Sequence, residues 1–448
     1  MGPPNGAAKP MASAGAAAGA AAAAAAATAA LMARYMRAVR VPKLVCSEDA
    51  EDLQQLLLDE AGAALREPYW PHILHWHWTL SSFLAAVRAA PLPPSFRRSS
   101  EEQLLVLRDG GTVGLDWWGA VPVPTPAGGS IDSRPVALVL PGMANSSLSW
   151  YIRRCMERFA RAGFRPVALN YRGVEHMPIT SPRLGCADTW KDLPEVLAAV
   201  RAVMGSASAR IVAVGFSMGG TILAKYLGEM RGASGIEAAV IISPPLSYPA
   251  HQQELENRPV LSFAMALPLK LWLWSKRAQL AEHLPEIKMS KILRSTSLLE
   301  LAGTFLVCQG YADVSAYFRE NDPEPVLQYI ETPMLIVAAT DDPLAFPIPR
   351  EAICRRCDLL ASLASPRMRL ASAVQRQRPA STTPPTARNP KLLLAETDGG
   401  GHLGWAGWTA ASMGATMAGP SWADSMAARF LDFHLHRSRS RARLKARL

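Results

Sequence analysis

Short apolar runs alternate with helix-length amphipathic segments from Gln103 onward, and this alternation restricts the fold more than any other feature of the sequence. Runs such as VALVL, IVAV and MLIVAA are continuously apolar, as expected of parallel strands buried on both faces. The alternation predicts an α/β fold with a mainly parallel sheet flanked by helices. The predicted strands are Leu104–Leu107, Val113–Trp118, Val136–Leu140, Pro166–Leu169, Ile211–Val214, Ala239–Ile242, Met334–Ala338 and Leu392–Ala395. Helices are predicted near residues 149–163, 190–204, 219–230, 348–356 and 421–435.

Two long segments interrupt this alternation. Residues 246–330 separate two predicted strands by far more chain than one crossover helix needs, so we expect an inserted cap there. Within it, Val260–Trp274 is almost wholly apolar but too short to span a bilayer. We expect it to cover the substrate or touch a membrane, with an ordinary buried helix as the alternative. Residues 361–390 are rich in Ser, Thr, Pro and Arg without any acid, which predicts a disordered insert.

The N-terminal segment, residues 1–47, is of low complexity. Positions 11–33 carry no charge but include 16 alanines, so their length permits a membrane span while their hydrophobicity barely supports one. The basic residues that follow also suit an organelle-targeting peptide, and a disordered tail is the third possibility. Residues 48–100 are predicted to form a helical region, residues 101–436 the main α/β domain, and residues 437–448 a basic tail.

The net charge of +10 is concentrated outside the predicted domain core. Residues 1–47, 365–390 and 437–448 together hold 16 basic residues and no acid, which leaves the rest of the chain at −6. A mildly acidic globular part argues against a nucleic-acid partner. A membrane contact would therefore depend on apolar burial more than on charge, and the side chains expected to make it are Phe263, Leu267, Leu271, Trp272 and Leu273.

Cysteine and histidine spacing gives no support for a metal or cofactor. The six cysteines are too few and too scattered for a disulfide framework, so reduced thiols are expected. Cys354 and Cys357 form one C-x-x-C without a second ligand pair at zinc spacing. His72, His75 and His77 are not at the i, i+4 spacing of a helical metal site. We predict neither a metal ion nor a cofactor.

The sequence Gly215-Phe216-Ser217-Met218-Gly219 carries the central chemical signal. It lies directly between a predicted strand and a predicted helix, where a sharp turn exposes the serine and leaves no room for side chains at the flanking glycines. A serine hydroxyl in such a turn acts as a nucleophile when a histidine takes its proton and a carboxylate orients that histidine. Ser217 is therefore the predicted nucleophile.

The acid and the base are expected at the ends of later strands, in the order Ser, acid, His. Asp341 and Asp342 follow the strand Met334–Ala338, and His402 follows Leu392–Ala395 on a glycine-rich turn. We select Asp342 as the acid, because Asp341 is better placed to bond the turn. His402 is the predicted base.

A tetrahedral intermediate also needs two backbone N–H donors aimed at its oxyanion. Met218, directly after the nucleophile, is expected to supply one donor. Met143, in the turn after the strand Val136–Leu140, is expected to supply the other. Pro141 stands in that turn where many hydrolases carry a histidine, but the donor is a backbone group and tolerates the exchange.

These motifs resemble the α/β-hydrolase superfamily, and within it the YheT-like branch. The resemblance covers roughly residues 68–436 and rests on PGMANSS, LNYRGVEHMPITSPRLGCADTWKDL, VGFSMGGTILAKYLGE, TDDPL and GGGHLGW. It implies an α/β-hydrolase fold in which Ser217, Asp342 and His402 form the catalytic triad. The segment PHILHWHWT lacks the Gln-Thr usual in the branch, and the 60 positions from Asp342 to His402 approach the branch's spacing only without the insert 361–390.

Together the motifs and the resemblance predict a serine hydrolase that cleaves carboxylic esters of lipids, such as acylglycerols or phospholipids. Alternatives on the same fold are an acyltransferase or thioesterase, although no H-x4-D acyltransferase signature is present. A non-catalytic lipid-binding module is the alternative from another class. The expected partners are a lipid ester and a membrane, and the expected location is membrane-associated through an N-terminal anchor or, alternatively, inside an organelle.

Overall fold

The computed structural model describes residues 13–47, 50–71, 104–119, 134–206, 208–306, 309–345, 347–353, 389–405, 407–408 and 421–445. Their main element is a nine-stranded sheet in the order β1-β10-β9-β8-β7-β5-β6-β4-β3. Strands β5 to β10 pair in parallel, whereas β1, β4 and β3 add antiparallel edges. The strands are β1 Lys43–Cys46, β3 Leu105–Val106, β4 Thr112–Trp117, β5 Val136–Leu140, β6 Arg165–Asn170, β7 Ile211–Phe216, β8 Ala239–Ile242, β9 Met334–Ala339 and β10 Leu392–Thr397. The predicted α/β fold is confirmed, and each predicted strand is present within two residues of its expected ends.

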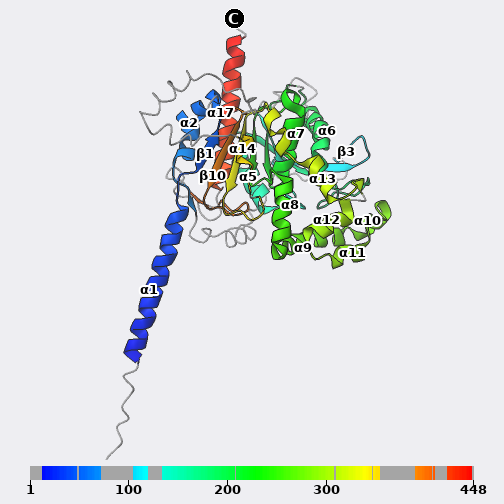
Figure 1. Cartoon of the computed structure of the whole chain (residues 1–448). Helices are drawn as coiled ribbons and strands as arrows, with labels where there is room; N and C mark the ends of the chain where they lie inside the picture. Colours follow the sequence, from blue (N-terminus) through cyan, green and yellow to red (C-terminus); the bar gives the residue numbers. More distant parts are fainter. Residues whose placement is uncertain are drawn as a thin grey trace, which may run out of the picture.

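Helices cover both faces of the sheet because its strands present apolar side chains on both sides (Figure 1). Ala137 and Val139 of β5 pack in one cluster, and Val136 and Leu138 pack in the other. The first cluster contains α2 Glu51–Leu58, α5 Trp150–Arg161 and α17 Trp422–Lys445. The second contains α6 Leu193–Val203, α7 Met218–Met230 and α14 Arg350–Ile353. The predicted helices near 149, 190, 219, 348 and 421 correspond to α5, α6, α7, α14 and α17.

The structure changes the limits expected for the terminal segments. Lys43–Cys46, assigned to the low-complexity segment 1–47, forms the edge strand β1 against β10. The four residues of β1 are too short a run to reveal a strand by periodicity. The basic tail 437–448 begins as a continuation of α17, which runs to Lys445. The helical region after residue 48 is broken into α2, η1 (Glu60–Gly62) and α3 (Ala63–Arg66), followed by β2 (Trp70–Pro71), which pairs with β11 (Gly407–Trp408).

The chain between β8 and β9, predicted as an inserted cap, folds into helices that form an apolar cluster together with residues of the segment 179–187. In the described residues these helices are α8 Tyr248–Asn257, α9 Pro259–Ser275, α10 Arg277–His283, α11 Met289–Arg294, α12 Leu298–Leu306 and α13 Val314–Asn321. A short helix, η7 (Glu324–Tyr329), then leads into β9. The cap lies at one end of the molecule, at the lower right of Figure 1.

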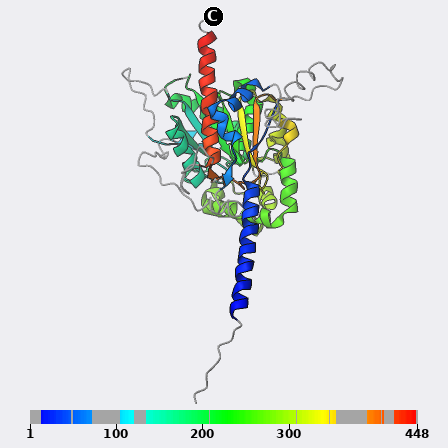
Figure 2. The same cartoon turned by 90° about the vertical axis from the view of Figure 1, so that its left-hand side faces the viewer.

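Helix α1 (Ser13–Ala38) projects from the body on the side where the cap lies, and the end of α17 points the opposite way (Figures 1 and 2). In the described part of the chain, no helix combines the length and the hydropathy that crossing a bilayer requires. The expectations for the insert 361–390, for Cys354 and Cys357, and for His72, His75 and His77 concern segments outside the described residues.

A buried ion pair ties α17 to α5 across the first cluster. The Arg154 Nε lies 2.9 Å from Asp424 Oδ2, and both side chains are more than nine-tenths buried. The same Asp424 oxygen accepts the backbone N–H of Ser421 at 3.1 Å, at the start of α17. Removal of the carboxylate would leave a guanidinium without its counter-charge in a low-dielectric setting.

We therefore expect Asp424→Ala to lower the free energy of unfolding by about 3–5 kcal/mol, as is typical when one partner of a buried ion pair is removed. Urea denaturation followed by circular dichroism measures this loss. The control is Asp432→Ala on the same helix, whose ion pair with His436 is largely exposed and whose loss should cost about 0.5 kcal/mol or less. Equal effects of the two substitutions would contradict the role of the Arg154–Asp424 pair.

Candidate active site

Ser217 occupies a strained turn between β7 and α7. Its backbone has φ 51° and ψ −120°, in a region that residues with a side chain rarely adopt. The flanking glycines make the turn possible, because a Cβ at Gly215 would lie 2.4 Å from the Gly219 carbonyl oxygen. A Cβ at Gly219 would lie 2.2 Å from the carbonyl oxygen of Leu140. The turn therefore requires glycine at both positions and presents the serine hydroxyl at the carboxyl end of the sheet.

His402 connects this serine to a carboxylate. Its Nε2 lies 3.0 Å from Ser217 Oγ, and its Nδ1 lies 3.0 Å and 3.1 Å from the two carboxylate oxygens of Asp342. The three residues come from the ends of β7, β9 and β10, which are neighbours or near neighbours in the sheet. The structure thus brings together the three side chains that the sequence selected, in the order Ser, His, Asp needed for proton transfer.

The Asp342 carboxylate is buried but well supplied with hydrogen bonds. The backbone N–H groups of Leu344 and Ala345 donate to its Oδ1 at 2.8 Å and 3.1 Å. Burial by itself would raise the pKa of Asp342, but the neighbouring His402 and hydrogen bonds from Ser243 and Leu344 hold that pKa below its usual value. The carboxylate stays ionised and is able to orient the imidazole.

Asp341 has a different environment from its neighbour. Its Oδ1 accepts the backbone N–H of Gly401 at 2.9 Å and so holds the turn that carries His402. Burial, together with repulsion from Asp342, raises the pKa of Asp341 to about 6 despite that hydrogen bond. Of the two aspartates, Asp342 is therefore the one placed against His402, and Asp341 bonds the turn.

The two expected oxyanion donors lie beside the serine. Met143 and Met218 both line the hollow into which Ser217 opens. The turn that carries Met143 is fixed by two tyrosines. The Gly142 N–H donates to the Tyr151 hydroxyl at 2.9 Å, and the Tyr171 hydroxyl donates to the Pro141 carbonyl at 2.7 Å. These contacts hold the backbone in place without the histidine that other hydrolases carry at the position of Pro141.

Sequence reasoning missed two residues of this site, and both follow β8. Ser243, at φ 50°, hydrogen-bonds Asp342 through its hydroxyl, which also accepts the Leu403 N–H at 3.4 Å. His251, on α8, lines the same hollow as Ser217. The sequence feature that could have indicated Ser243 is its position in Ser243-Pro244-Pro245, directly after β8. Polar residues at the carboxyl ends of neighbouring parallel strands lie close together.

The hollow in front of Ser217 is mostly apolar. Its outer wall comes from the cap, including Leu255 of α8, Leu269 of α9, and Leu298 and Phe305 of α12. Its lining combines the turn that carries Ser217 with a hydrocarbon surface, which suits an ester joined to an apolar chain.

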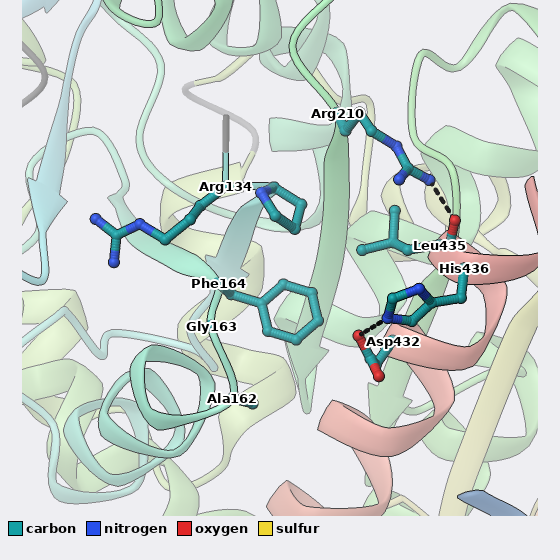
Figure 3. A pocket seen from close by; sticks show the side chains of 9 residues that line it. Arg134, Ala162, Gly163, Phe164, Arg210, Asp432, Leu435 and His436 are labelled. Carbon is teal, nitrogen blue, oxygen red and sulfur yellow. Dashed lines mark hydrogen bonds and ion pairs between the residues drawn. The ribbon is translucent and has the colours of Figure 1, made fainter. Parts of the chain in front are cut away.

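A second hollow, of about 290 Å³, lies at the opposite edge of the sheet (Figure 3). Pro135, Phe164 and Arg210, which line it, directly precede β5, β6 and β7. Arg210 is bonded to Glu237 and to the Leu435 carbonyl of α17. Ligands of parallel sheets bind at the carboxyl ends of the strands. The second hollow lies at their amino ends, and we interpret it as part of the contact between the sheet and α17.

No three His, Cys, Asp or Glu side chains gather as a metal-holding group in the part of the chain that the structure describes. The expectation that the protein uses neither metal nor cofactor stays a prediction.

Comparison with known proteins follows this geometry. A sequence model of the alpha/beta hydrolase family matches residues 137–406. The chain is 28% identical over 351 residues to the embryogenesis-associated protein EMB8 of Picea glauca, covering 74% of this chain and 66% of that protein. It is 25% identical over 368 residues to phospholipase ABHD3 of Homo sapiens, covering 81% of this chain and 79% of that protein. It is 30% identical over 226 residues to monoacylglycerol lipase ABHD2 of Homo sapiens, covering 46% of this chain and 52% of that protein.

The matched family segment spans more than half of the chain and contains Ser217, Asp342 and His402. The predicted mainly parallel sheet is also observed, and the chain belongs to the α/β hydrolase family.

Proposed function

We propose that the protein is a serine hydrolase that cleaves carboxylic esters of lipids. The observation that carries this proposal is the 3.0 Å contact between Ser217 Oγ and His402 Nε2, beside an apolar hollow that Ser217 lines. Among the similar proteins, two are named as lipid ester hydrolases, a phospholipase and a monoacylglycerol lipase. Their names and the hydrocarbon lining of the hollow together support a lipid ester as the substrate.

The proposed reaction begins when Ser217 Oγ attacks the ester carbonyl and its proton passes to His402 Nε2. Asp342 stabilises the imidazolium that forms, and the N–H groups of Met143 and Met218 bind the oxyanion. The imidazolium then gives its proton to the departing alcohol oxygen, which leaves an acyl group on Ser217. Water, deprotonated by His402, attacks this acyl-enzyme and releases the carboxylic acid.

Two alternatives from the sequence differ from this proposal in one step each. An acyltransferase or thioesterase would form the same acyl-enzyme but use another acceptor or leaving group. A lipid-binding module would form none, and such a module has no use for a strained serine held beside a histidine and a buried carboxylate. Membership of the YheT-like branch remains a proposal that the same motifs support.

We further propose that the protein contacts a lipid surface through α9. Along this helix one face exposes a row of apolar side chains, namely Val260, Phe263, Leu267, Leu271 and Trp274. Two of the residues expected on this face are elsewhere: Leu273 is fully buried, and the Trp272 indole donates to the Gly173 carbonyl at 2.8 Å. Because apolar residues occur on all sides of the helix over Val260–Trp274, their spacing in the sequence does not show which face is exposed.

The position of helix α1 also supports a lipid surface on the side of the molecule where the cap lies. It projects from the side of the molecule on which the cap lies (Figures 1 and 2). Its Leu31, Met32 and Met36 are each about half exposed. A lipid surface on this side would meet α1 and the exposed row of α9 together. Targeting to an organelle, the other prediction for residues 1–47, concerns the same N-terminal segment and is a separate question.

Ser217→Ala should lower kcat for a p-nitrophenyl ester by at least about 10³-fold, because the covalent step loses its nucleophile. The variant should also lose labelling by a fluorophosphonate probe, while its thermal unfolding midpoint stays near that of the native chain. Ser243→Ala is the matched control, since this serine follows the neighbouring strand β8 and its hydroxyl hydrogen-bonds Asp342 and the Leu403 N–H rather than His402 Nε2. It should keep the labelling. Retained turnover in Ser217→Ala would refute the proposed nucleophile.

Asp342→Asn should lower kcat by about 10³–10⁴-fold, because an amide favours the wrong imidazole tautomer and cannot stabilise the imidazolium. Asp341→Asn should change kcat by no more than a few-fold, since its amide oxygen still accepts the Gly401 N–H. Steady-state kinetics on a soluble short-chain ester compares the two. A larger loss in Asp341→Asn would reverse the assignment of the acid.

The paired substitution Leu271→Gln and Trp274→Gln should weaken binding to phosphatidylcholine vesicles by about tenfold or more, because each large apolar side chain contributes about 1.5–3 kcal/mol when buried. Sedimentation of the full chain with vesicles in high salt measures this, since salt screens charge but not apolar burial. The control pair is Leu58→Gln and Val106→Gln, two exposed apolar residues on α2 and β3, outside the cap segment of the chain. Release of the native chain by salt alone would show an electrostatic contact instead.

A further inference from the structure

His251 is an unusual residue in the hollow in front of Ser217. It lies on α8, at the edge of the cap, and its Nδ1 is buried without a hydrogen-bond partner. A buried polar atom without a hydrogen-bond partner destabilises a folded protein. The unpartnered Nδ1 of His251 in an apolar wall therefore needs a physical reason. A substrate group that enters the hollow would supply the missing partner.

Other polar side chains in this wall are already engaged. The Tyr317 hydroxyl accepts the Ala187 N–H at 2.9 Å, and the Trp272 indole donates to Gly173. The Cys186 thiol donates to an Asp188 oxygen at 3.0 Å. The Tyr248 hydroxyl is hydrogen-bonded to Thr221. Among the described residues that line the hollow, His251 is therefore the one whose side chain has a buried polar atom without a hydrogen-bond partner.

The charge of the wall limits what that polar part can be. Burial, with repulsion from His402, lowers the pKa of His251 to about 4, so its ring is neutral at physiological pH. A neutral imidazole donates with one nitrogen and accepts with the other, which matches a hydroxyl group. No Lys or Arg is among the described residues that line the hollow. A phosphate placed there would lose its water without gaining a cation.

The side of the ester that meets His251 follows from the place of this residue in the hollow. His251 lines the hollow together with Ser217, whose Oγ lies 3.0 Å from His402 Nε2, and repulsion from the His402 ring contributes to the low pKa of His251. His402 delivers its proton to the leaving oxygen, so groups near it belong to the alcohol part of the ester. The acyl chain is left with the apolar wall formed by Leu269, Leu298 and Phe305.

We propose that His251 is a specificity-determining residue that hydrogen-bonds a free hydroxyl on the alcohol part of the substrate, so that the enzyme prefers neutral, hydroxyl-bearing esters to esters with a phosphate head group. This inference rests on the proposed ester hydrolysis and names its substrate class. It assigns to the unpartnered ring nitrogen a partner that the reaction brings in.

The test compares three oleoyl esters presented in the same detergent micelles: 1-oleoylglycerol, methyl oleate, which has no free hydroxyl, and 1-oleoyl-glycero-3-phosphate. The native enzyme should show the highest kcat/KM for 1-oleoylglycerol and the lowest for the phosphate. His251→Phe should lower kcat/KM for 1-oleoylglycerol by tenfold or more and change methyl oleate by less than about threefold. His251→Gln keeps a hydrogen-bond donor and an acceptor, so its kcat/KM for 1-oleoylglycerol should lie between those of the native enzyme and His251→Phe. Leu255→Met, in the same wall of α8, should shift all three esters equally.

Each result decides between the two proposals. Equal losses on all esters in His251→Phe would mean a structural role and overturn the inference, as would phosphate ester turnover matching that of 1-oleoylglycerol. Ser217-dependent hydrolysis of methyl oleate without any effect at His251 would sink this inference alone. Absence of turnover on every ester would instead refute the proposed function. His251→Phe should unfold at the native temperature or above it, because it removes an unsatisfied polar atom; a clear decrease would indicate lost packing.

Discussion

The close approach of α7 to the ends of β5 and β7 is the constraint on which the site depends. At Gly219 the carbonyl oxygens of Leu140 and Pro141 leave no space for a Cβ, and at Gly215 the backbone of α7 leaves none. The chain must therefore reverse direction within one residue, and Ser217 absorbs the strain of that reversal. Neighbouring strands on both sides hold β7 in the middle of the sheet, so the turn has no room to relax.

Strand register then brings the remaining groups to this point. Phe216 pairs with Ile242, Ile242 with Val337, and Ala339 with Thr397, so β7, β8, β9 and β10 end at one edge. Ser243, Asp342 and His402 follow these ends, although His402 is 185 positions from Ser217 along the chain. Parallel pairing thus converts distant sequence positions into hydrogen-bond neighbours without any long loop having to fold on its own.

The sheet and the principal residues of the site could be predicted because both depend on local patterns. Buried parallel strands appear as continuous apolar runs, and the residues after such runs meet at one edge. Strand β1 is too short to produce a pattern, and it is recognised only by its pairing with β10. Ser243 and His251 have no motif, since their positions depend on how the cap leaves β8. The catalytic roles of Ser217, Asp342 and His402 stay a proposal, which their geometry supports.

Helix α9 has an apolar side toward the hollow and another toward solvent. Met265 and Leu269 line the hollow, whereas Leu271 and Trp274 are exposed on the outside. Exposure of this outer row to water is unfavourable, and contact with another apolar surface would remove it from water. The same row on a second copy of the protein is one such surface. Self-association and the proposed lipid binding would then compete for one face. Apparent affinity for lipid would consequently fall as protein concentration rises, and the dilute protein would be the form most available to a membrane.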